Sequence, residues 1–353
     1  FQALSLALND VDCGHGSPPG LVDILRAHSL PNFSLTGEVV YVDQFGKASR
    51  CKVSPAKPQQ AKYRLASMTK AITAHAIFEL SALGELDLNA RLLSFFPEVN
   101  PDSLRDARLR EVKIFQLLNH SSGFGGPFGS DNMVRKGEIP WCPYDFRKLE
   151  SVRLAGIPGS NHVYSNVAYC LLGEVISRVT RIPYRQYIRS HYLHGTSLDF
   201  VEGAYLPEEP IYDFSNEIRF DREYISWLDF GALSSSAGMI GSPEEFAQVI
   251  WQKVRLDAKK MLADPSARSC GAGRVETCYA WNFELGLDEQ GKVTAGIQQG
   301  YMPGVSSMLA VTEDGQVLVW VAAGAAIESR FKDDMKKAVL EFLRSQSSSG
   351  AAS

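Results

Sequence analysis

Residues 65–83 read LASMTKAITAHAIFELSAL, and this stretch decides the fold. Ser67 is followed three residues later by Lys70, and neither glycine nor proline interrupts the run before Gly84. The apolar residues recur at helical spacing, and Gly84 stands where a left-handed residue commonly ends a helix. Because helix residues three positions apart share a face, the pattern predicts that Ser67 and Lys70 lie side by side.

The pattern S-x-x-K occurs twice more, at Ser49–Lys52 and Ser54–Lys57. The first copy lies in an alternating run that predicts a strand, where residues three apart point to opposite faces. The second ends just before Pro58, which disfavours helical geometry in the residue ahead of it. Only Ser67 therefore begins a sustained helix. Its spacing alone leaves two interpretations open: a nucleophile whose proton a neutral lysine accepts, or a capping serine beside a solvated lysine.

Residues 162–180, HVYSNVAYCLLGEVISRVT, hold a second polar pair. We expect Tyr164 and Asn166 on a loop directly ahead of an apolar helix. A phenol close to a lysine ammonium has its ionised form favoured, so Tyr164 can serve as a general base for Ser67. The Asn166 amide can hold both the lysine and a substrate carbonyl. The alternative is a tyrosine that packs the loop and an asparagine that forms a turn.

The composition excludes several classes of partner. The chain has 353 residues, of which 45% are apolar and 22% charged, with a net charge of −4, so we expect no basic surface for nucleic acid. The apolar run VLVWVAAGAAI at residues 317–327 is shorter than the roughly 20 residues of a membrane-spanning helix, and it predicts a buried strand. Residues 1–8, FQALSLAL, fit either the end of a removed signal peptide or the first turn of a helix. An exported and a cytoplasmic location both stay open.

The six cysteines contain no C-x-x-C pattern. An even number permits disulfides, and Cys270 and Cys278 bracket a Gly-rich loop that a bridge can close, but free thiols are the favoured interpretation. The motifs H-E-x-x-H and G-x-S-x-G do not occur. We therefore expect no metal, no other cofactor and no nucleophile elbow of the α/β-hydrolase type.

Strand-like runs stand at both ends of the chain. Two runs around Asp43–Gly46 predict a hairpin, and alternating runs after residue 275 precede a closing amphipathic helix. Residues from about 85 to 250 are mostly helical in pattern. The predicted fold class is α+β: an antiparallel β-sheet flanked by N- and C-terminal helices, with a mostly helical inserted domain. We assign residues 1–84 and 275–353 to the sheet domain and 85–274 to the helical domain.

Segments spread along the chain resemble the serine β-lactamase-like family, which comprises class C β-lactamases, D-Ala-D-Ala peptidases, and related esterases and acyltransferases. They are RLASMTKAITAHAIFELSALGELDLNARLLSFFPEV at 64–99, VKIFQLLNHSSGFGG at 112–126, VYSNVAYCLLGEVISRVTRIPYRQYI at 163–188 and GALSSSAGMIGSPEEFAQVI at 231–250. The likeness covers roughly residues 35 to 345. It implies a β-lactamase/transpeptidase-like fold with the site in the cleft between the domains.

The resemblance also implies roles for individual residues. Ser67 matches the nucleophile, Lys70 the proton partner that keeps it activated, and Tyr164 the base that later protonates the leaving group. The family's third motif, K-T-G or H-x-G, falls on Gln298, Gln299 and Gly300. Gly300 keeps the close backbone approach, and the backbone N–H groups of Ser67 and Tyr301 would form the oxyanion hole.

Gln298 departs from the family pattern, because a cation at this position normally holds a substrate carboxylate. A charged hydrogen bond to a carboxylate contributes about 1.5–3 kcal/mol, so its loss weakens the binding of penicillins or D-Ala-terminated peptides by roughly ten- to a hundredfold. A neutral glutamine suits a neutral ester, thioester or amide instead.

A rival to Tyr164 stands in a Gly-rich loop, where Ser130, Asp131 and Asn132 spell the S-D-N motif of class A β-lactamases. No apolar helix follows them in register, and we interpret this match as coincidence. The sequence thus predicts a serine hydrolase or acyltransferase with an acyl-enzyme on Ser67, acting on a small neutral ester, thioester or amide, with a second acyl-acceptor substrate allowed. A β-lactamase or D,D-peptidase, and a catalytically silent binding protein on the same scaffold, are the alternatives.

Overall fold

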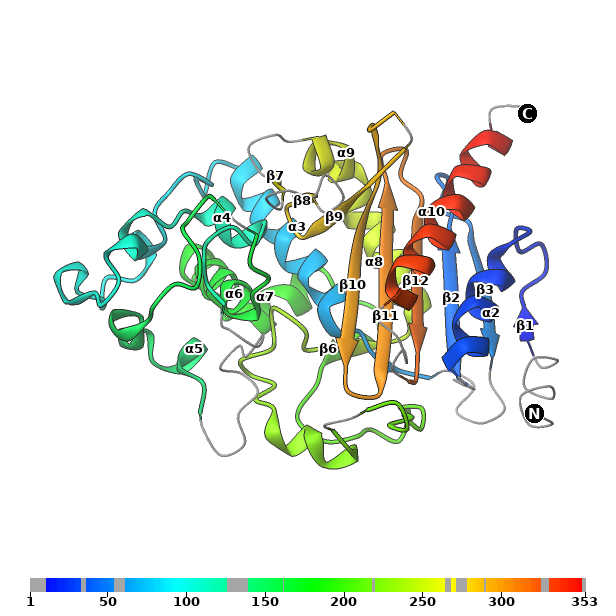
Figure 1. Cartoon of the computed structure of the whole chain (residues 1–353), viewed down its shortest axis with the longest axis horizontal. Coiled ribbons are helices and arrows are strands. Elements are labelled where there is room, and N and C mark those ends of the chain that lie inside the picture. Colours follow the sequence, from blue (N-terminus) through cyan, green and yellow to red (C-terminus); the bar gives the residue numbers. More distant parts are fainter. Residues whose placement is uncertain are drawn as a thin grey trace.

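The computed structural model describes residues 11–32, 36–53, 61–125, 139–160, 162–217, 220–263, 268–270, 278–288, 290–324 and 330–350. Within these ranges, nine antiparallel strands form one sheet in the order β1-β3-β2-β12-β11-β10-β9-β8-β7 (Figure 1). The strands are β1 Val11–Cys13, β2 Gly37–Val42, β3 Ala48–Val53, β7 Arg268–Cys270, β8 Cys278–Ala280, β9 Phe283–Leu287, β10 Val293–Met302, β11 Val305–Thr312 and β12 Val317–Ala322. Both ends of the chain build this sheet, and the predicted α+β class is confirmed.

The strands form where the sequence alternates or stays apolar. β2 and β3 make the predicted hairpin, in which Val42 pairs with Ala48 and Gly46 takes a left-handed φ of 90°. β12 is buried along its whole length, because side chains on one face join the helical core and those on the other join the core under the terminal helices. A continuous apolar run is the pattern expected of a strand that is covered on both faces.

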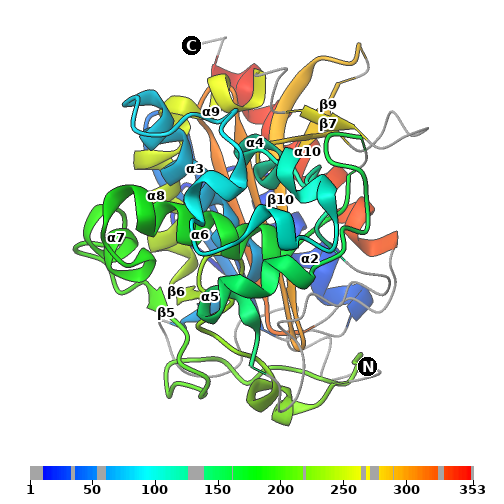
Figure 2. The same ribbon diagram turned by 90° about the vertical axis from the view of Figure 1, so that its left-hand side faces the viewer.

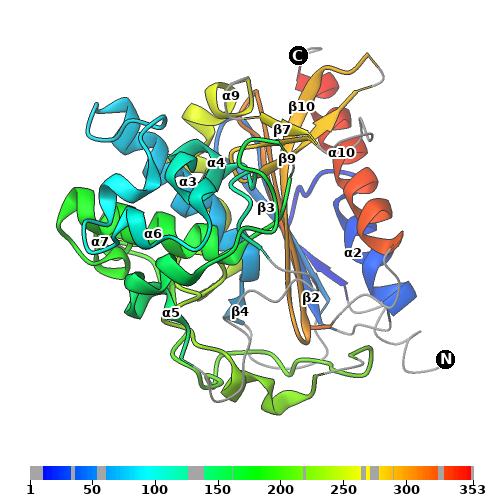
Figure 3. The ribbon, with the colours of Figure 1, turned by 60° about the vertical axis from the view of Figure 1, so that its left-hand side comes forward.

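Two helices from opposite ends of the chain cover one face of the sheet. These are α2 (Leu21–Asn32) and α10 (Arg330–Gly350), which lie side by side in Figures 1 and 3. Their apolar side chains, such as Leu25 and Val339, pack with Ile297 of β10. The flanking terminal helices predicted from the sequence are therefore present.

The other face carries most of the remaining helices, seen from their own side in Figure 2. The α-helices are α3 Thr69–Ala82, α4 Ile114–Leu118, α5 Trp141–Tyr144, α6 Asn166–Thr180, α7 Tyr184–His191, α8 Pro243–Lys253 and α9 Arg255–Ala263. Short 3₁₀ turns are η1 Ala66–Met68, η2 Leu92–Phe95, η3 Pro101–Ser103, η4 Ala107–Glu111, η5 Phe146–Ser151 and η6 Arg222–Trp227. A small sheet joins β4 Tyr63–Arg64, β6 Met239–Gly241 and β5 Asp199–Phe200.

Helices α8 and α9 pack on the central sheet, although both fall in the range that we assigned to the helical domain. α8 contacts β2 and β12, and α9 contacts β10 and β11. The division into residues 1–84 with 275–353 and residues 85–274 stays a prediction. No helix of the described part is long and apolar enough to cross a membrane.

The expectation of free thiols is wrong. Cys13 on β1 is bonded to Cys51 on β3, Cys142 in α5 is bonded to Cys170 in α6, and Cys278 is also disulfide-bonded. The two named pairs are 38 and 28 residues apart in the chain. Such partners meet only because the fold brings their elements together, so the spacing of cysteines in the sequence does not reveal them.

Candidate active site

Ser67 lies in the 3₁₀ turn η1, one residue ahead of the long helix α3. Neither η1 nor α3 begins with a side-chain capping bond, which removes the interpretation of Ser67 as a capping serine. Its neighbour Ala66 has a left-handed φ of 48°. A residue with a Cβ in this region carries backbone strain of order 1–3 kcal/mol, and strain of this kind is concentrated at functional sites. The turn therefore holds Ser67 in a fixed, unusual position.

Lys70 follows on the first turn of α3, and its side chain has no solvent exposure. Its Nζ donates to Ser67 Oγ at 3.1 Å, to Asn166 Oδ1 at 2.7 Å and to the carbonyl of Ser236 at 2.8 Å. An ammonium has three N–H donors, and these three neutral acceptors match them in number. The predicted contact between Ser67 and Lys70 is thus present in the structure.

The copy at Ser49–Lys52 differs from this one. Ser49 and Lys52 lie on β3, as predicted, and Lys52 Nζ lies 3.8 Å from the carboxylate of Asp12. Ser54–Lys57 falls outside the described residues, as do Ser130, Asp131 and Asn132 of the S-D-N match.

Tyr164 contacts the same serine oxygen as Lys70. Its hydroxyl donates to Ser67 Oγ at 2.6 Å, and Lys70 Nζ lies 4.9 Å from the centre of its ring. The side chain is 39% exposed, so one side of the phenol faces solvent. Ser67 Oγ therefore has two proton partners, an amine and a phenol.

Asn166 is the first residue of α6 rather than a loop residue, because Ser165 caps the helix by accepting a hydrogen bond from the N–H of Ala168. This corrects the boundary expected from the sequence. The Asn166 side chain nevertheless holds Lys70, as predicted. Its amide and the Ser236 carbonyl anchor Nζ from two elements distant in sequence.

The imidazole ring of His120 packs against the ring of Tyr164. Its ring centre lies 4.5 Å from that of Tyr164, and its Nδ1 accepts a hydrogen bond from the N–H of Ser165 at 3.2 Å. Burial and the charge of Lys70 hold the pKa of His120 well below its usual value, so the imidazole is neutral. Next to it, burial lowers the pKa of His162 to about 4, and the His162 ring stacks on Tyr279. These aromatic rings fix the orientation of the phenol.

The sequence patterns assign no catalytic role to His120, Ser236, His162 or Tyr279. The segment around Ser236 belongs to the quoted resemblance, but a backbone carbonyl leaves no mark in a sequence. His162 lies two residues before Tyr164 in the sequence, and this closeness is the one feature of the sequence that points to a place for His162 near the site.

Gly300 lies on β10 against the segment that carries the nucleophile. A Cβ added at this position would overlap Ser307 Oγ and come within 3.1 Å of the Leu65 carbonyl oxygen and 3.2 Å of Ala66 Cβ. Ser307, its partner on β11, donates a hydrogen bond to the same Leu65 carbonyl at 3.1 Å. Only a residue without a side chain permits this approach, so the placement of Gly300 agrees with the prediction.

Gln298 and Tyr301 point to opposite faces of β10, because side chains alternate along a strand. Gln298 shares the face of Gly300 and is 3% exposed; its Nε2 donates to the Gln299 carbonyl at 2.7 Å. The Tyr301 side chain is half-exposed and donates from its hydroxyl to Glu217 at 2.6 Å. The role of the Tyr301 N–H in an oxyanion hole stays a prediction.

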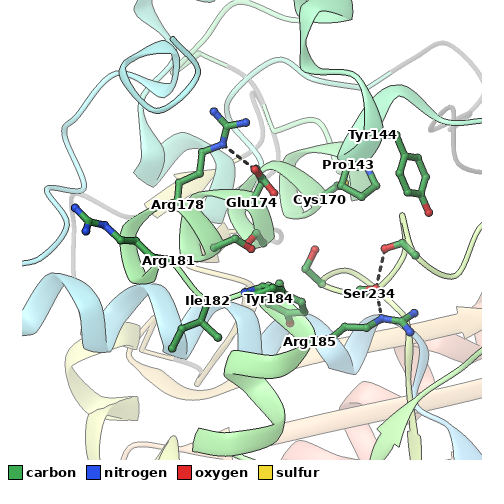
Figure 4. Close-up of a pocket in the computed structure, with 15 residues that line it drawn as sticks. Pro143, Tyr144, Cys170, Glu174, Arg178, Arg181, Ile182, Tyr184, Arg185 and Ser234 are labelled. Carbon is green, nitrogen blue, oxygen red and sulfur yellow. Dashed lines mark hydrogen bonds and ion pairs between the residues drawn. The ribbon is translucent and has the colours of Figure 1, made fainter. Parts of the chain in front are cut away.

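Two further features lie apart from these residues. A cavity of about 540 Å³ is lined by residues of α5, α6 and α7 together with Gly231, Ser234 and Ser235 (Figure 4), and no predicted site residue lines it. In it Arg178 pairs with Glu174 at 2.7 Å, and Arg185 donates to Ser234 Oγ at 2.7 Å. Among the described side chains, no group of three or more His, Cys, Asp or Glu is arranged to hold a metal ion.

The fold and the paired S-x-x-K and Y-x-N residues define a serine β-lactamase-like protein. Residues 34–322 match the family described as Beta-lactamase, and the chain belongs to that family. Proteins similar to this chain include an esterase, a D-amino acid amidase and a β-lactamase/D-alanine carboxypeptidase.

Relatives with different names match the chain. A putative fimbrial assembly protein FimD, serogroup D, of Dichelobacter nodosus is 25% identical over 90% of this chain and 82% of its own length. Esterase EstB of Burkholderia gladioli is 36% identical over 42% of this chain and 39% of its own length. The D-amino acid amidase of Ochrobactrum anthropi SV3, solved with L-phenylalanine amide, superposes with a TM-score of 0.68 at 17% identity over 98% of this chain and 99% of that one. At that identity the match shows the fold alone.

Proposed function

We propose that this protein is a serine hydrolase or acyltransferase that forms an acyl-enzyme on Ser67. The observation that carries the proposal is the contact of Ser67 Oγ with two proton partners at once, Lys70 Nζ at 3.1 Å and Tyr164 OH at 2.6 Å. A serine hydroxyl is a weak nucleophile until a neighbouring base accepts its proton. A phenol and an amine on one hydroxyl supply such a base and a route for returning the proton.

The reaction proceeds in two halves. Ser67 Oγ bonds to the substrate carbonyl carbon as its proton passes to the phenolate of Tyr164 or the neutral amine of Lys70. The N–H groups of Ser67 and Tyr301 hold the oxyanion. The bond to the leaving group then breaks, and the leaving group takes the proton. Water, or a second alcohol or amine, then gives a proton to the same base as it bonds to the acyl carbon, and Ser67 Oγ leaves and takes that proton back.

The favoured substrate is a neutral ester, thioester or amide. Gln298 offers no charge to a carboxylate, which argues against penicillins and D-Ala-terminated peptides. The partial match to an esterase supports ester turnover, and the fold shared with a D-amino acid amidase is compatible with amides. β-Lactamase or D,D-peptidase activity is the second candidate. The match to a putative fimbrial assembly protein over 90% of the chain supports the third, a non-catalytic binding protein.

A fluorophosphonate probe tests the proposal, because it reacts with activated serines regardless of substrate specificity. We expect it to label the wild type and not Ser67→Ala, whereas Ser49→Ala, the matched control from another S-x-x-K copy, labels like the wild type. No labelling of the folded wild type contradicts the enzyme and supports the binding protein. Turnover of p-nitrophenyl butyrate above that of nitrocefin favours the esterase, and the reverse order favours the β-lactamase.

A further inference from the structure

We infer that Gln298 is a specificity residue whose side-chain oxygen accepts a hydrogen bond from an N–H group of the substrate, so that the site selects a neutral carboxamide where a carboxylate would otherwise bind. The inference rests on the proposed function and names its substrate class more closely.

The position of Gln298 follows from β10. Gln298 and Gly300 are two residues apart on the same face, and each strand residue advances the chain by about 3.3 Å, so their Cα atoms lie roughly 7 Å apart. Gly300 packs against Leu65 and Ala66, directly ahead of Ser67. A small molecule whose carbonyl is held at Ser67 therefore has Gln298 within reach of its other end.

The orientation of the amide is fixed by its neighbour. Nε2 donates to the Gln299 carbonyl at 2.7 Å. Turning the amide over would set its oxygen against that carbonyl oxygen, and two acceptors repel. The oxygen Oε1 is therefore an acceptor that Gln298 can offer to a ligand, and Nε2 keeps one further N–H beside it.

Gln298 Oε1 is a hydrogen-bond acceptor to which no donor of the described residues is bonded. Oε1 is buried and forms no hydrogen bond with any described residue, and the whole residue is only 3% exposed. A buried polar atom without a partner is costly, and a substrate group that pairs with it is bound correspondingly more tightly. An ionised carboxylate carries acceptors alone and cannot pair with it, whereas a carboxamide brings two N–H donors.

The charge of the site disfavours one other kind of donor, a substrate ammonium. Lys70 is buried in contact with Ser67, so a substrate bound there already lies beside a basic group. A second cation, such as a substrate ammonium, would be repelled by a protonated lysine, but a neutral amide N–H would not. The combination of an acceptor without a partner and a neighbouring lysine selects a neutral donor.

Two esters that differ at a single group test this inference: the hippuric esters of glycolic acid and of glycolamide. Both have the same acyl group and the same ester bond, and their leaving groups carry a carboxylate and a carboxamide respectively. We expect the wild type to show a kcat/KM for the glycolamide ester at least about tenfold above that for the glycolate ester.

Three variants test whether the preference for the glycolamide ester comes from the side chain of Gln298. Gln298→Met keeps the length of the side chain without the acceptor, and we expect it to lower kcat/KM for the glycolamide ester about tenfold. Gln298→Lys is expected to reverse the preference in favour of glycolate. Gln299→Met, on the opposite face of the strand, is the matched control and keeps the wild-type ratio.

Fluorophosphonate labelling, which involves neither leaving group, is measured on every variant and reports whether Ser67 remains active. If the wild type is labelled but hydrolyses both esters equally, or if Gln298→Met leaves the ratio unchanged, the inference is overturned and the proposed function stands. If the folded wild type is neither labelled nor active on either ester, the proposed function fails and the inference fails with it.

Discussion

Replacing Tyr164 by phenylalanine removes a single oxygen from the site. The phenol donates to Ser67 Oγ at 2.6 Å, while its ring lies 4.5 Å from the ring centre of His120 and 4.9 Å from Lys70 Nζ. Phenylalanine keeps both ring contacts, so the packing of the site is preserved. The variant therefore tests what the hydroxyl does, separately from the shape of the side chain.

The hydroxyl can either position Ser67 or act as a general base or acid, and these two roles predict different losses of reaction rate in Tyr164→Phe. A hydrogen bond that only positions Ser67 is worth about 0.5–1.5 kcal/mol, which is roughly a two- to thirteenfold change in rate. A general base or acid contributes about 10²- to 10⁴-fold, or some 2.7–5.4 kcal/mol of barrier. Because the phenol contacts the reacting oxygen directly, we expect Tyr164→Phe to lower kcat/KM by at least about 100-fold.

The assay compares kcat/KM on p-nitrophenyl butyrate with the rate of fluorophosphonate labelling. Tyr279→Phe is the matched control, because Tyr279 belongs to the same cluster of rings and its own ring stacks on that of His162 at 4.2 Å. We expect that control to stay near the wild-type rate. A folded Tyr164→Phe protein that loses less than about tenfold would refute the role of Tyr164 as the base.

Three further predictions concern the surroundings of the site. In Gly300→Ala the new methyl group overlaps Ser307 Oγ and meets the Leu65 carbonyl oxygen at 3.1 Å, so we expect slower fluorophosphonate labelling of Ser67 and a loss of about 1–3 kcal/mol of stability in denaturant melts. Burial raises the pKa of Glu38 to about 7 from 4.5, so the folded state favours the protonated carboxyl and loses stability as the pH rises through this range. Glu38→Gln should therefore gain stability over the wild type, by up to about 3 kcal/mol, at pH 8 and not at pH 4, and an equal difference at both would contradict this. Iodoacetamide under denaturing, non-reducing conditions should modify none of the four cysteines in the two named disulfides, and modification of any of them would refute that pairing.

The local geometry of the site could be predicted from the sequence. The contact between Ser67 and Lys70 follows from helical spacing. The hairpin of β2 and β3 likewise follows from alternation and from Gly46. Each of these depends on neighbours within a few residues, which is the range over which a sequence pattern is informative.

Contacts between distant segments could not be predicted in this way. The Ser236 carbonyl that anchors Lys70 is a backbone group, and nothing in the residue type reveals it. The direction of the Gln298 amide depends on the local path of β10, and the disulfides depend on which strands and helices meet. The resemblance to a family gave the order of the motifs, but not these details, because they are set by the packed fold.

Peptide mapping of the trapped acyl-enzyme tests the central claim most directly. The protein is mixed with p-nitrophenyl butyrate, quenched in acid and digested with trypsin, which cuts after Arg64 and Lys70. The account predicts a butyryl group on the peptide of residues 65–70, placed on Ser67 by fragmentation. A butyryl group on a different peptide, or hydrolysis that continues undiminished in Ser67→Ala, would contradict it.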